Sequence, residues 1–475
     1  MNFLIFPTQL YYNITNLREY DTIYLIEEPR YFTDFKFHKL KLAYHRATMK
    51  KYFSYLKSKK INVKYIDFFN VDSDFYLKIK KASFYDPVDK TLEKKLKKYL
   101  EYSILDQCQF LISKKEIYEN KFHSFDTFYK FMRIKLDILI DNNKPVGGKW
   151  SYDNENRKSL PKNINIPKSP KILNNEYIDE AKEYIEKHFK TNYGLLDNFI
   201  YPIDHKSTLK WLNNFLKEKL NQFGPYEDAV SSQYNFIFHS VLSPMMNIGL
   251  ILDIEVINKS VLFYNKNKSK ISLASFEGFI RQISGWRQYV YSMYELESVA
   301  LYNSNILKHI NKISDKWWDS VDIKPIDFLI TKIKNYAYVN HIERLMFLSN
   351  WLLLNKIDPK EVYKIFMEWT IDAYEWVMIP NVFGMGQYAS NIMMTRLYFS
   401  SSNYILKMSD FKNDETNWTK IWDAVYYSFI YKHKNILAKN YATAMQVKHW
   451  NNKSKEEQTN LLNIAKKYQT KLFSK

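Results

Sequence analysis

The sequence predicts an α/β domain followed by an all-helical domain. Short apolar runs at Phe3–Phe6, Thr22–Ile26 and Val63–Phe68 are separated by long intervals, one of them an amphipathic stretch around Phe37–Leu56. This spacing is typical of strand–helix–strand units, which build a mostly parallel sheet covered by helices. From about residue 176 onward, apolar residues recur three and four positions apart with almost no strand pattern, which indicates helices.

A segment of different composition separates the two regions. Residues 141–171 have little apolar periodicity, and they contain Gly147, Gly148 and four prolines, at positions 145, 161, 167 and 170. Such a composition favours a linker. We therefore predict an α/β domain at residues 1–135, an interdomain linker at 136–200 and a helical domain at 201–475. A length of 475 residues fits two or three domains.

The charge of the chain points to an anionic partner. Lysine and arginine number 70 against 51 acidic residues, which gives a net charge of +19. Such an excess attracts polyanions, so nucleic acid is the leading partner class. A lysine-rich solvated surface that reflects biased composition is the alternative, and charge does not decide between them.

Other counts exclude several classes of site. Cys108 is the single cysteine, which excludes intrachain disulfides and cysteine-rich metal sites. Glycine-rich phosphate loops are absent from the sequence, which has only 9 glycines. The start of the chain lacks a basic leader, and no apolar run reaches the roughly 18 residues that a membrane helix needs. We expect a soluble, intracellular protein of the cytoplasm, nucleoid or nucleus.

The segment Phe238–Asn247 contains a candidate anion site. Ser243 stands directly before Pro244, a pair typical of a helix N-cap and first turn. The amide groups at such a terminus can bind phosphate, with Ser240 and Ser243 as additional donors. More often, however, a Ser-Pro pair of this kind marks only a capped helix that binds no ligand.

Two helical stretches place polar groups among apolar ones. Phe279, Gln282, Trp286, Tyr289 and Met293 share one predicted face. The side-chain amide of Gln282 on this face either bonds a neighbouring backbone group or contacts a ligand in a pocket with aromatic walls.

The second stretch begins at His341, which shares a face with Leu345, Leu348 and Leu352, with Arg344 one turn further on. A core histidine is the common explanation. Proton transfer would need an adjacent substrate, and no second ligand follows at metal-binding spacing.

These segments resemble the photolyase/cryptochrome superfamily, and most of all its bacterial (6-4) photolyase branch, the deoxyribodipyrimidine photolyase-related proteins. The resemblance is collinear over nearly the whole chain. It rests on Glu27–His38, Lys39–Met49, Lys144–Trp150, Phe238–Gly249, Glu277–Val290, His341–Met346, Asp372–Trp376, Ser402–Ile405 and Met408–Asp410. It implies a Rossmann-like antenna domain and a helical domain that binds FAD. It also implies a ribolumazine or deazaflavin antenna chromophore, UV-damaged DNA as the partner and a monomeric state.

The resemblance also implies roles for single residues. The segment with Ser240, Leu242, Ser243 and Asn247 holds the FAD diphosphate, Arg344 lies close to the isoalloxazine, and the amide of Asn403 faces flavin N5. The other implied cofactor-binding residues are Arg281, Trp286, Arg287 and Asp372. The implied catalytic residues are His341, Gln282, Asn340 and Tyr404, and the implied DNA-binding residues are Lys149, Trp150, Trp286 and Tyr404.

Two positions favour one lesion over another. The (6-4) enzymes have histidine at the position of His341 and glutamine at that of Gln282, where the main cyclobutane-dimer class has asparagine and glutamate. We therefore expect light-driven (6-4) repair by electron transfer from reduced FAD. A cyclobutane pyrimidine dimer photolyase and a cryptochrome-like blue-light photoreceptor without repair activity are the alternatives.

The sequence departs from this branch at its metal cluster and its electron relay. The four cluster cysteines align with Pro325, Lys412, Glu415 and Lys420, so we predict no iron–sulfur cluster and no metal. The relay tryptophan and tyrosine align with Ile365 and Phe366, which are not readily oxidised. Trp317, Trp369 and Trp376 are candidates for another route.

Overall fold

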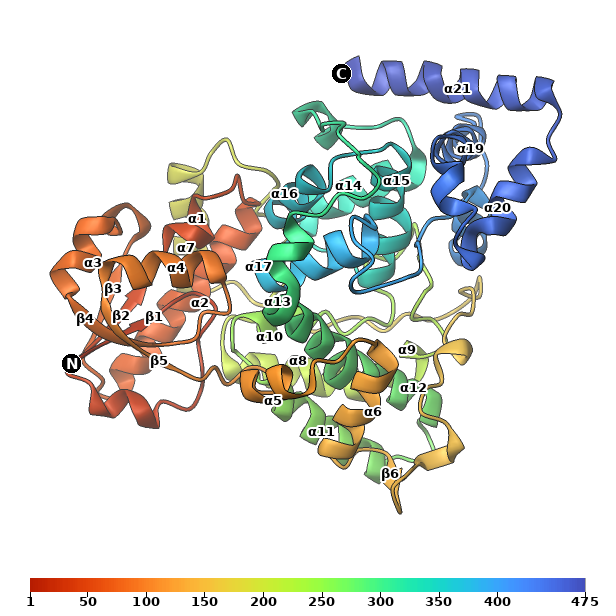
Figure 1. Cartoon of the computed structure of the whole chain (residues 1–475). Helices are drawn as coiled ribbons and strands as arrows, with labels where there is room; N and C mark the ends of the chain where they lie inside the picture. Colours follow the sequence, from red (N-terminus) through yellow and green to blue (C-terminus); the bar gives the residue numbers. More distant parts are fainter. Residues whose placement is uncertain (475) are drawn as a thin grey trace.

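The computed structural model describes residues 1–474 and shows an α/β part followed by a helical part (Figure 1). The first part holds five strands: β1 (Asn2–Ile5), β2 (Thr22–Ile26), β3 (Val63–Ile66), β4 (Lys81–Tyr85) and β5 (Glu101–Leu105). Its helices are α1 (Pro29–Phe32), α2 (Lys39–Ser58), α3 (Ser73–Ile79), α4 (Lys90–Tyr99) and α7 (Glu176–His188). The predicted fold class is confirmed.

The strands form one parallel sheet in the order β3-β2-β1-β4-β5. In its centre Leu4 pairs with Tyr24 of β2 and with Phe84 of β4. Phe3, Leu4 and Ile5 have no exposed surface, because a parallel sheet is covered on both faces. Helix α2 packs against β3 and against α7.

The remaining elements build the helical part. They are α5 (Lys114–Asn120), α6 (Phe125–Lys135), α8 (His205–Glu218), α9 (Leu220–Phe223), α10 (Ser243–Asn247), α11 (Asp253–Lys266), α12 (Leu273–Ile280), α13 (Arg287–Tyr302), α14 (Lys324–Tyr336), α15 (Asn350–Leu354), α16 (Pro359–Trp369), α17 (Glu375–Ile379), α18 (Ser402–Met408), α19 (Trp418–Leu437), α20 (Tyr441–Asn451) and α21 (Lys455–Ser474). A short hairpin of β6 (Ile140–Asp141) and β7 (Lys144–Pro145) follows α6. No helix of the described chain is both long and apolar enough to cross a membrane.

The chain crosses between the two parts more than once. Helices α5 and α6 lie within residues 1–135, yet they pack against α13 of the helical part. Helix α7 lies in the predicted linker, yet it packs against α2 of the α/β part. The boundaries at residues 135 and 200 stay predictions.

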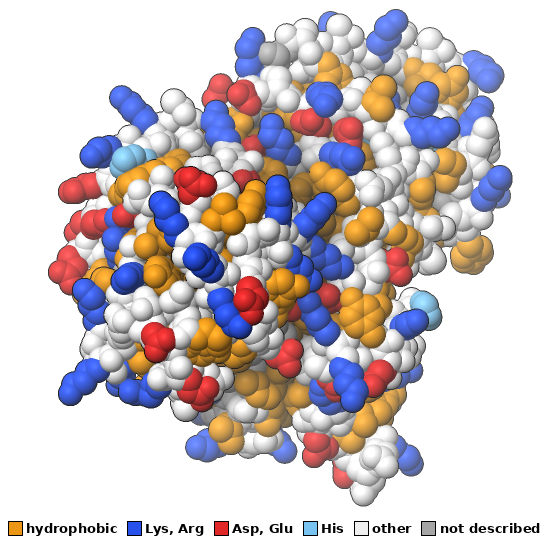
Figure 2. All heavy atoms as spheres, turned by 60° about the vertical axis from the view of Figure 1, so that its left-hand side comes forward, with side chains coloured by type: hydrophobic (Ala, Val, Ile, Leu, Met, Phe, Trp, Pro, Cys, Tyr) orange, Lys and Arg blue, Asp and Glu red, His pale blue; other side chains and the backbone are white. Residues whose placement is uncertain are grey.

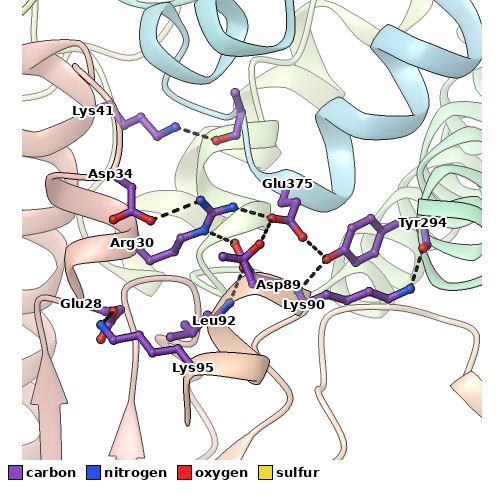
Figure 3. Close-up of polar contacts among 12 residues, drawn as sticks. Glu28, Arg30, Asp34, Lys41, Asp89, Lys90, Leu92, Lys95, Tyr294 and Glu375 are labelled. Atoms are coloured by element: carbon purple, nitrogen blue, oxygen red, sulfur yellow. Dashed lines mark hydrogen bonds and ion pairs between the residues drawn. The ribbon is translucent and has the colours of Figure 1, made fainter. Parts of the chain in front are cut away.

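A buried ionic network joins the two parts (Figure 3). Arg30 of α1 bonds Asp89 through Nε at 2.9 Å and Glu375 of α17 through a terminal nitrogen at 2.5 Å. The hydroxyl of Tyr294, on α13, donates to the other oxygen of Glu375 at 2.6 Å. The side chains of Arg30, Asp89 and Glu375 are less than a tenth exposed. Because these charges are removed from water, each depends on its partners.

A buried lysine makes a second connection between the parts. Lys41 of α2 donates from Nζ to the carbonyl oxygens of Ala373 at 2.6 Å and Met367 at 3.1 Å. Burial lowers the pKa of Lys41 to about 7, although Asp372 opposes the shift. The amine thus holds the backbone on both sides of the turn that leads to Asp372.

Candidate functional site

The helical part encloses a cavity of about 270 Å³. Three π-helical stretches, Arg281–Trp286, Glu343–Ser349 and Pro380–Gly386, each contribute to its wall. Such stretches are rare and often occur at functional sites. Residues singled out from the sequence meet here: Ser240, Leu242, Ser243, Asn247, Gln282, Trp286, Arg287, Asn340, His341, Arg344 and Asp372.

The two helical faces predicted from the sequence reach the cavity only in part. After Trp286, Val290 lines the cavity in place of the predicted Tyr289. After Leu345, Ser349 lines it in place of the predicted Leu348. Tyr289 and Leu348 are buried, at 0% and 2% exposed, so the predicted faces point inward although not every residue on them borders the cavity.

Asp372 organises one polar wall. Its Oδ1 accepts a hydrogen bond from Arg344 at 2.7 Å, and its Oδ2 accepts one from the hydroxyl of Ser243 at 2.5 Å. The amide of Asn247 donates to the Asp372 carbonyl at 2.8 Å. The Asp372 side chain is 7% exposed and that of Arg344 is 14% exposed. This wall therefore carries a buried ion pair between Arg344, in the π-helical stretch Glu343–Ser349, and Asp372, in the loop between α16 and α17.

Arg287 organises the adjoining wall. Its Nε bonds both carboxylate oxygens of Asp253, at 2.9 and 2.8 Å, and another nitrogen donates to Asn247. The guanidinium lies 4.8 Å from the ring centroid of Trp376 and 5.1 Å from that of Phe110. Burial raises the pKa of Asp253 while Arg287 opposes the shift. The arginine therefore holds a fixed positive charge at the cavity.

The helix expected at Ser243 is present but differs from the prediction. Helix α10 spans only Ser243–Asn247, and its N-cap is Leu242, which has no side chain to accept a hydrogen bond. Ser243 lies inside the first turn and donates its hydroxyl to Asp372. The prediction that Ser243 caps the helix is wrong, because the carboxylate takes its hydroxyl.

His341 and Trp286 lie side by side in the cavity, with ring centroids 6.2 Å apart. Solvent reaches His341 through the cavity, yet the surrounding protein and the charge of Arg344 lower its pKa to about 4. The imidazole is therefore neutral at pH 7. Asn340 also lines the cavity, and its backbone and side chain exchange hydrogen bonds of 2.8 and 3.0 Å with Glu343.

Two carboxyl groups that the sequence analysis did not single out line the same cavity. Glu227 and Asp228 lie in the loop between α9 and α10. The amide nitrogen of Gln282 donates to Glu227 at 2.5 Å. Burial raises the pKa of Glu227 to about 7 and that of Asp228 to about 6. Neither carboxyl group belongs to a recognisable spacing, so only the fold reveals them.

Three residues of the cavity wall have buried polar atoms without a hydrogen-bond partner in residues 1–474. These atoms are His239 Nε2, a terminal nitrogen of Arg287 and Asn381 Oδ1. The amide nitrogen of Asn381 donates to the carbonyl of Val377 at 2.8 Å, which fixes the amide on the third π-helical stretch. Buried polar groups are normally satisfied, so these atoms indicate space for a polar ligand.

Other predicted residues lie outside the cavity lining. Arg281 turns toward Asp153, Glu227 and Glu277, at 3.1 to 3.6 Å. Asn403 is exposed on α18, and Tyr404 beside it is half-buried.

Lys149 and Trp150 lie after the β6–β7 hairpin. Lys149 is exposed and pairs with Glu155 at 3.6 Å. Trp150 lies 5.3 Å from the guanidinium of Arg133 on α6, the helix that packs against the stretch Arg281–Trp286.

The region of the predicted missing cluster is held by other contacts. Lys324 pairs with Asp414 at 2.5 Å, and the indole nitrogen of Trp418 donates to the carbonyl of Lys412 at 3.0 Å. Pro325 is buried in the first turn of α14. Within residues 1–474, no three His, Cys, Asp or Glu side chains are grouped to hold a metal ion.

Comparison with known proteins is consistent with these observations. Residues 3–201 match the family described as deoxyribodipyrimidine photo-lyase-related protein. A (6-4) photolyase of Agrobacterium fabrum is 31% identical over 359 residues, which cover 74% of this chain and 70% of the relative.

Solved structures share the fold. A bacterial class III photolyase from Agrobacterium tumefaciens superposes with a TM-score of 0.57 at 15% identity, over 99% of this chain and 98% of its own. An archaeal photolyase from Sulfolobus tokodaii with two FAD molecules gives a TM-score of 0.54 at 13% identity, over 98% and 100%. The resemblance found in the sequence is confirmed: the chain belongs to the deoxyribodipyrimidine photolyase-related family of the photolyase/cryptochrome superfamily.

Proposed function

We propose that the protein is a light-driven DNA photolyase that repairs (6-4) photoproducts. The observation that carries the proposal is the presence of His341, Gln282 and Trp286 together in one cavity. A relative named as a (6-4) photolyase matches most of the chain, which supports the same lesion.

The residues of the cavity fit FAD. The unpartnered atoms of Arg287, Asn381 and His239 offer both donors and an acceptor to a polar ring system. Arg287 supplies positive charge for a diphosphate, Arg344 supplies it beside the isoalloxazine, and apolar side chains such as Met246, Phe366 and Met385 cover the remaining wall. Asn381 is a further candidate for the role that the resemblance implied for Asn403, because Asn381 lines the cavity and Asn403 does not. One of the structural neighbours holds two FAD molecules.

Bound reduced FAD would supply one electron to the lesion on absorbing light. The residues of the chain bind the damaged base, orient it and supply a proton to it. Trp286 offers an aromatic face to a base that has left the duplex, and the poor pairing of a damaged base lowers the cost of extrusion. Gln282 and His341 then face the base edge with hydrogen-bonding groups.

His341 changes its protonation when DNA docks. In the free protein we expect it to titrate near pH 4, because the surrounding protein and the charge of Arg344 lower its pKa to about 4. Nearby phosphates favour the charged form, so addition of a lesion-containing duplex should raise that pKa. NMR titration of protein with labelled histidines measures the shift, and His341→Asn identifies the signal. An unchanged pKa on DNA binding would argue against a role as proton donor.

The experiment that tests the lesion assignment illuminates chemically reduced protein with oligonucleotides that carry either lesion. We expect the (6-4) photoproduct to disappear. His341→Asn should retain flavin and lose repair by about 100-fold or more, the usual effect of removing a general acid. His433→Asn, a buried histidine outside the cavity lining, is the matched control. Full (6-4) repair by His341→Asn contradicts the role of His341. Repair of cyclobutane dimers but not of (6-4) photoproducts by the wild type contradicts the lesion assignment.

A cryptochrome-like photoreceptor without repair is a second candidate. Phe366, which is not readily oxidised, lines the cavity where the resemblance expects a relay residue. If reduced protein binds flavin and repairs neither lesion, this candidate replaces the first. The candidates for another electron route include Trp376, which also lines the cavity, whereas Trp369 packs against Trp318 with ring centroids 5.0 Å apart.

The α/β part is the proposed site of a ribolumazine or deazaflavin antenna, and damaged DNA is the proposed partner of a monomer. Lys149, Trp150, Trp286 and Tyr404 are the proposed DNA contacts. The net charge of +19 supports DNA as the partner. Figure 2 shows Lys and Arg side chains scattered over one face among Asp and Glu, rather than gathered in one patch. Charge alone therefore marks no docking face in this view.

A further inference from the structure

Gln282 contacts a carboxyl group inside the cavity. Its amide nitrogen donates to Glu227 Oε1, and the other oxygen of Glu227 accepts from Asn156 at 3.3 Å. The Glu227 side chain is 14% exposed. Within residues 1–474 the side-chain oxygen of Gln282, Oε1, accepts no hydrogen bond, and both residues line the cavity. The amide therefore turns its nitrogen to Glu227 and leaves its oxygen available to a ligand.

This arrangement depends on the charge of Glu227. A carboxylate only accepts hydrogen bonds, so it binds the NH₂ group of the amide. A protonated carboxyl group also donates, so it can bind the amide oxygen and leave the NH₂ group available instead. One proton on Glu227 thus decides whether Gln282 presents an acceptor or a donor to the cavity.

Three charged groups near Glu227 affect its pKa. Arg281 lies 3.6 Å from it and favours the carboxylate. Asp228 in the same loop and Asp153, which itself pairs with Arg281 at 3.1 Å, favour the protonated form. Burial contributes most, and the result is a pKa raised to about 7. Both protonation states are therefore accessible near neutral pH.

We infer that Glu227 is a positioning residue that sets the orientation of the Gln282 amide, and so determines which base edge the cavity accepts. This inference rests on the proposed function, since it supposes that a damaged base enters beside Gln282. With Glu227 ionised, Gln282 accepts from an N–H or O–H group of the base. With Glu227 protonated, the amide of Gln282 donates to a carbonyl oxygen of the base. The saturated base of a (6-4) photoproduct carries N–H and O–H groups, so the ionised form suits that lesion.

The test measures dark binding of flavin-loaded protein to a duplex with a single (6-4) lesion and to the undamaged duplex, from pH 6 to 8.5. The ratio of the two affinities removes the general effect of pH on DNA binding. We expect the preference for the lesion to rise about tenfold with pH, because a mismatched hydrogen-bonding edge costs about that factor. In Glu227→Gln, which cannot ionise, the preference should not change with pH. Gln282→Leu, which keeps Glu227 and removes the amide, should also lose the pH dependence.

Asp228→Asn is the matched control, because Asp228 lines the same cavity and is not bonded to Gln282. It should keep a rise in preference with pH. If Glu227→Gln or Gln282→Leu keeps the wild-type rise, or if the wild type shows none, the inference is wrong. If the wild type binds both duplexes equally at every pH, the proposed function fails with it. Flavin absorbance of each variant confirms that the cavity is intact.

Discussion

Replacing Arg30 with methionine is expected to lower the free energy of unfolding by about 3 to 5 kcal/mol. Arg30 is the cation between Asp89 and Glu375, and its removal leaves two carboxylates in a dry interface. Urea denaturation of wild type and variant measures the difference.

The effect of this substitution should depend on pH. Burial and Glu375 raise the pKa of Asp89 to about 6. A carboxyl group with a raised pKa in the folded state favours folding at low pH, and this contribution is lost as the pH rises through about 6. Protonation of Asp89 removes one uncompensated charge, so the destabilisation by Arg30→Met should be smaller at pH 5 than at pH 8.

Two further variants make the result specific. Lys81→Met removes an ion pair to Glu101 whose side chains are 58% and 70% exposed, and it should cost less than about 1 kcal/mol. Combining Arg30→Met with Glu375→Gln should recover part of the lost stability. If Arg30→Met unfolds at the same urea concentration as Lys81→Met, the network does not hold the two parts together.

Replacing Asp372 with alanine is expected to weaken FAD binding about 100-fold or more. Asp372 bonds both Arg344 and Ser243, and truncating one partner of a buried, hydrogen-bonded charge pair typically costs about 2 to 5 kcal/mol. Arg344 keeps its Nε bond to the carbonyl oxygen of Val339 at 2.8 Å but loses the carboxylate that balances its charge and orients its terminal nitrogen at the cavity. The ratio of flavin to protein absorbance after purification, and fluorescence titration with added FAD, measure the loss.

The control for this variant is Asp414→Ala, which removes an ion pair to Lys324 outside the cavity lining. It should bind FAD like the wild type. Circular dichroism distinguishes loss of the cofactor from loss of the fold. Wild-type affinity in a folded Asp372→Ala protein would show that the Asp372 wall does not hold the flavin.

The sequence predicted the α/β and helical parts because strand spacing and helical periodicity are local properties. It also placed His341 and Gln282 on inward faces. It missed Val290 and Ser349 because helical spacing does not distinguish the inward residues that border a cavity from those, such as Tyr289 and Leu348, that are buried without lining it. It missed Glu227 because a carboxyl group in a loop gains its neighbours only when the loop is placed.

Prediction also failed where a residue had a choice of partner. Ser243 was expected to cap a helix, and it bonds Asp372 from a distant part of the chain. Arg281, expected at the cofactor, pairs with Asp153, Glu227 and Glu277, and its role at the cofactor stays a prediction. A periodic pattern gives the side of the helix but not which acidic groups the fold brings to that side.

The contacts of Lys41 with the helical part limit where the protein can be truncated. Its ammonium group ties down carbonyls more than 300 positions away along the polypeptide, beside the aspartate that anchors the cavity wall. A shortened molecule that starts after the sheet would leave those oxygens unsatisfied. The α/β part thus supports the cavity wall and is also the proposed binding site of an antenna. Exchanging the α/β part between relatives requires an equivalent amine at the position of Lys41.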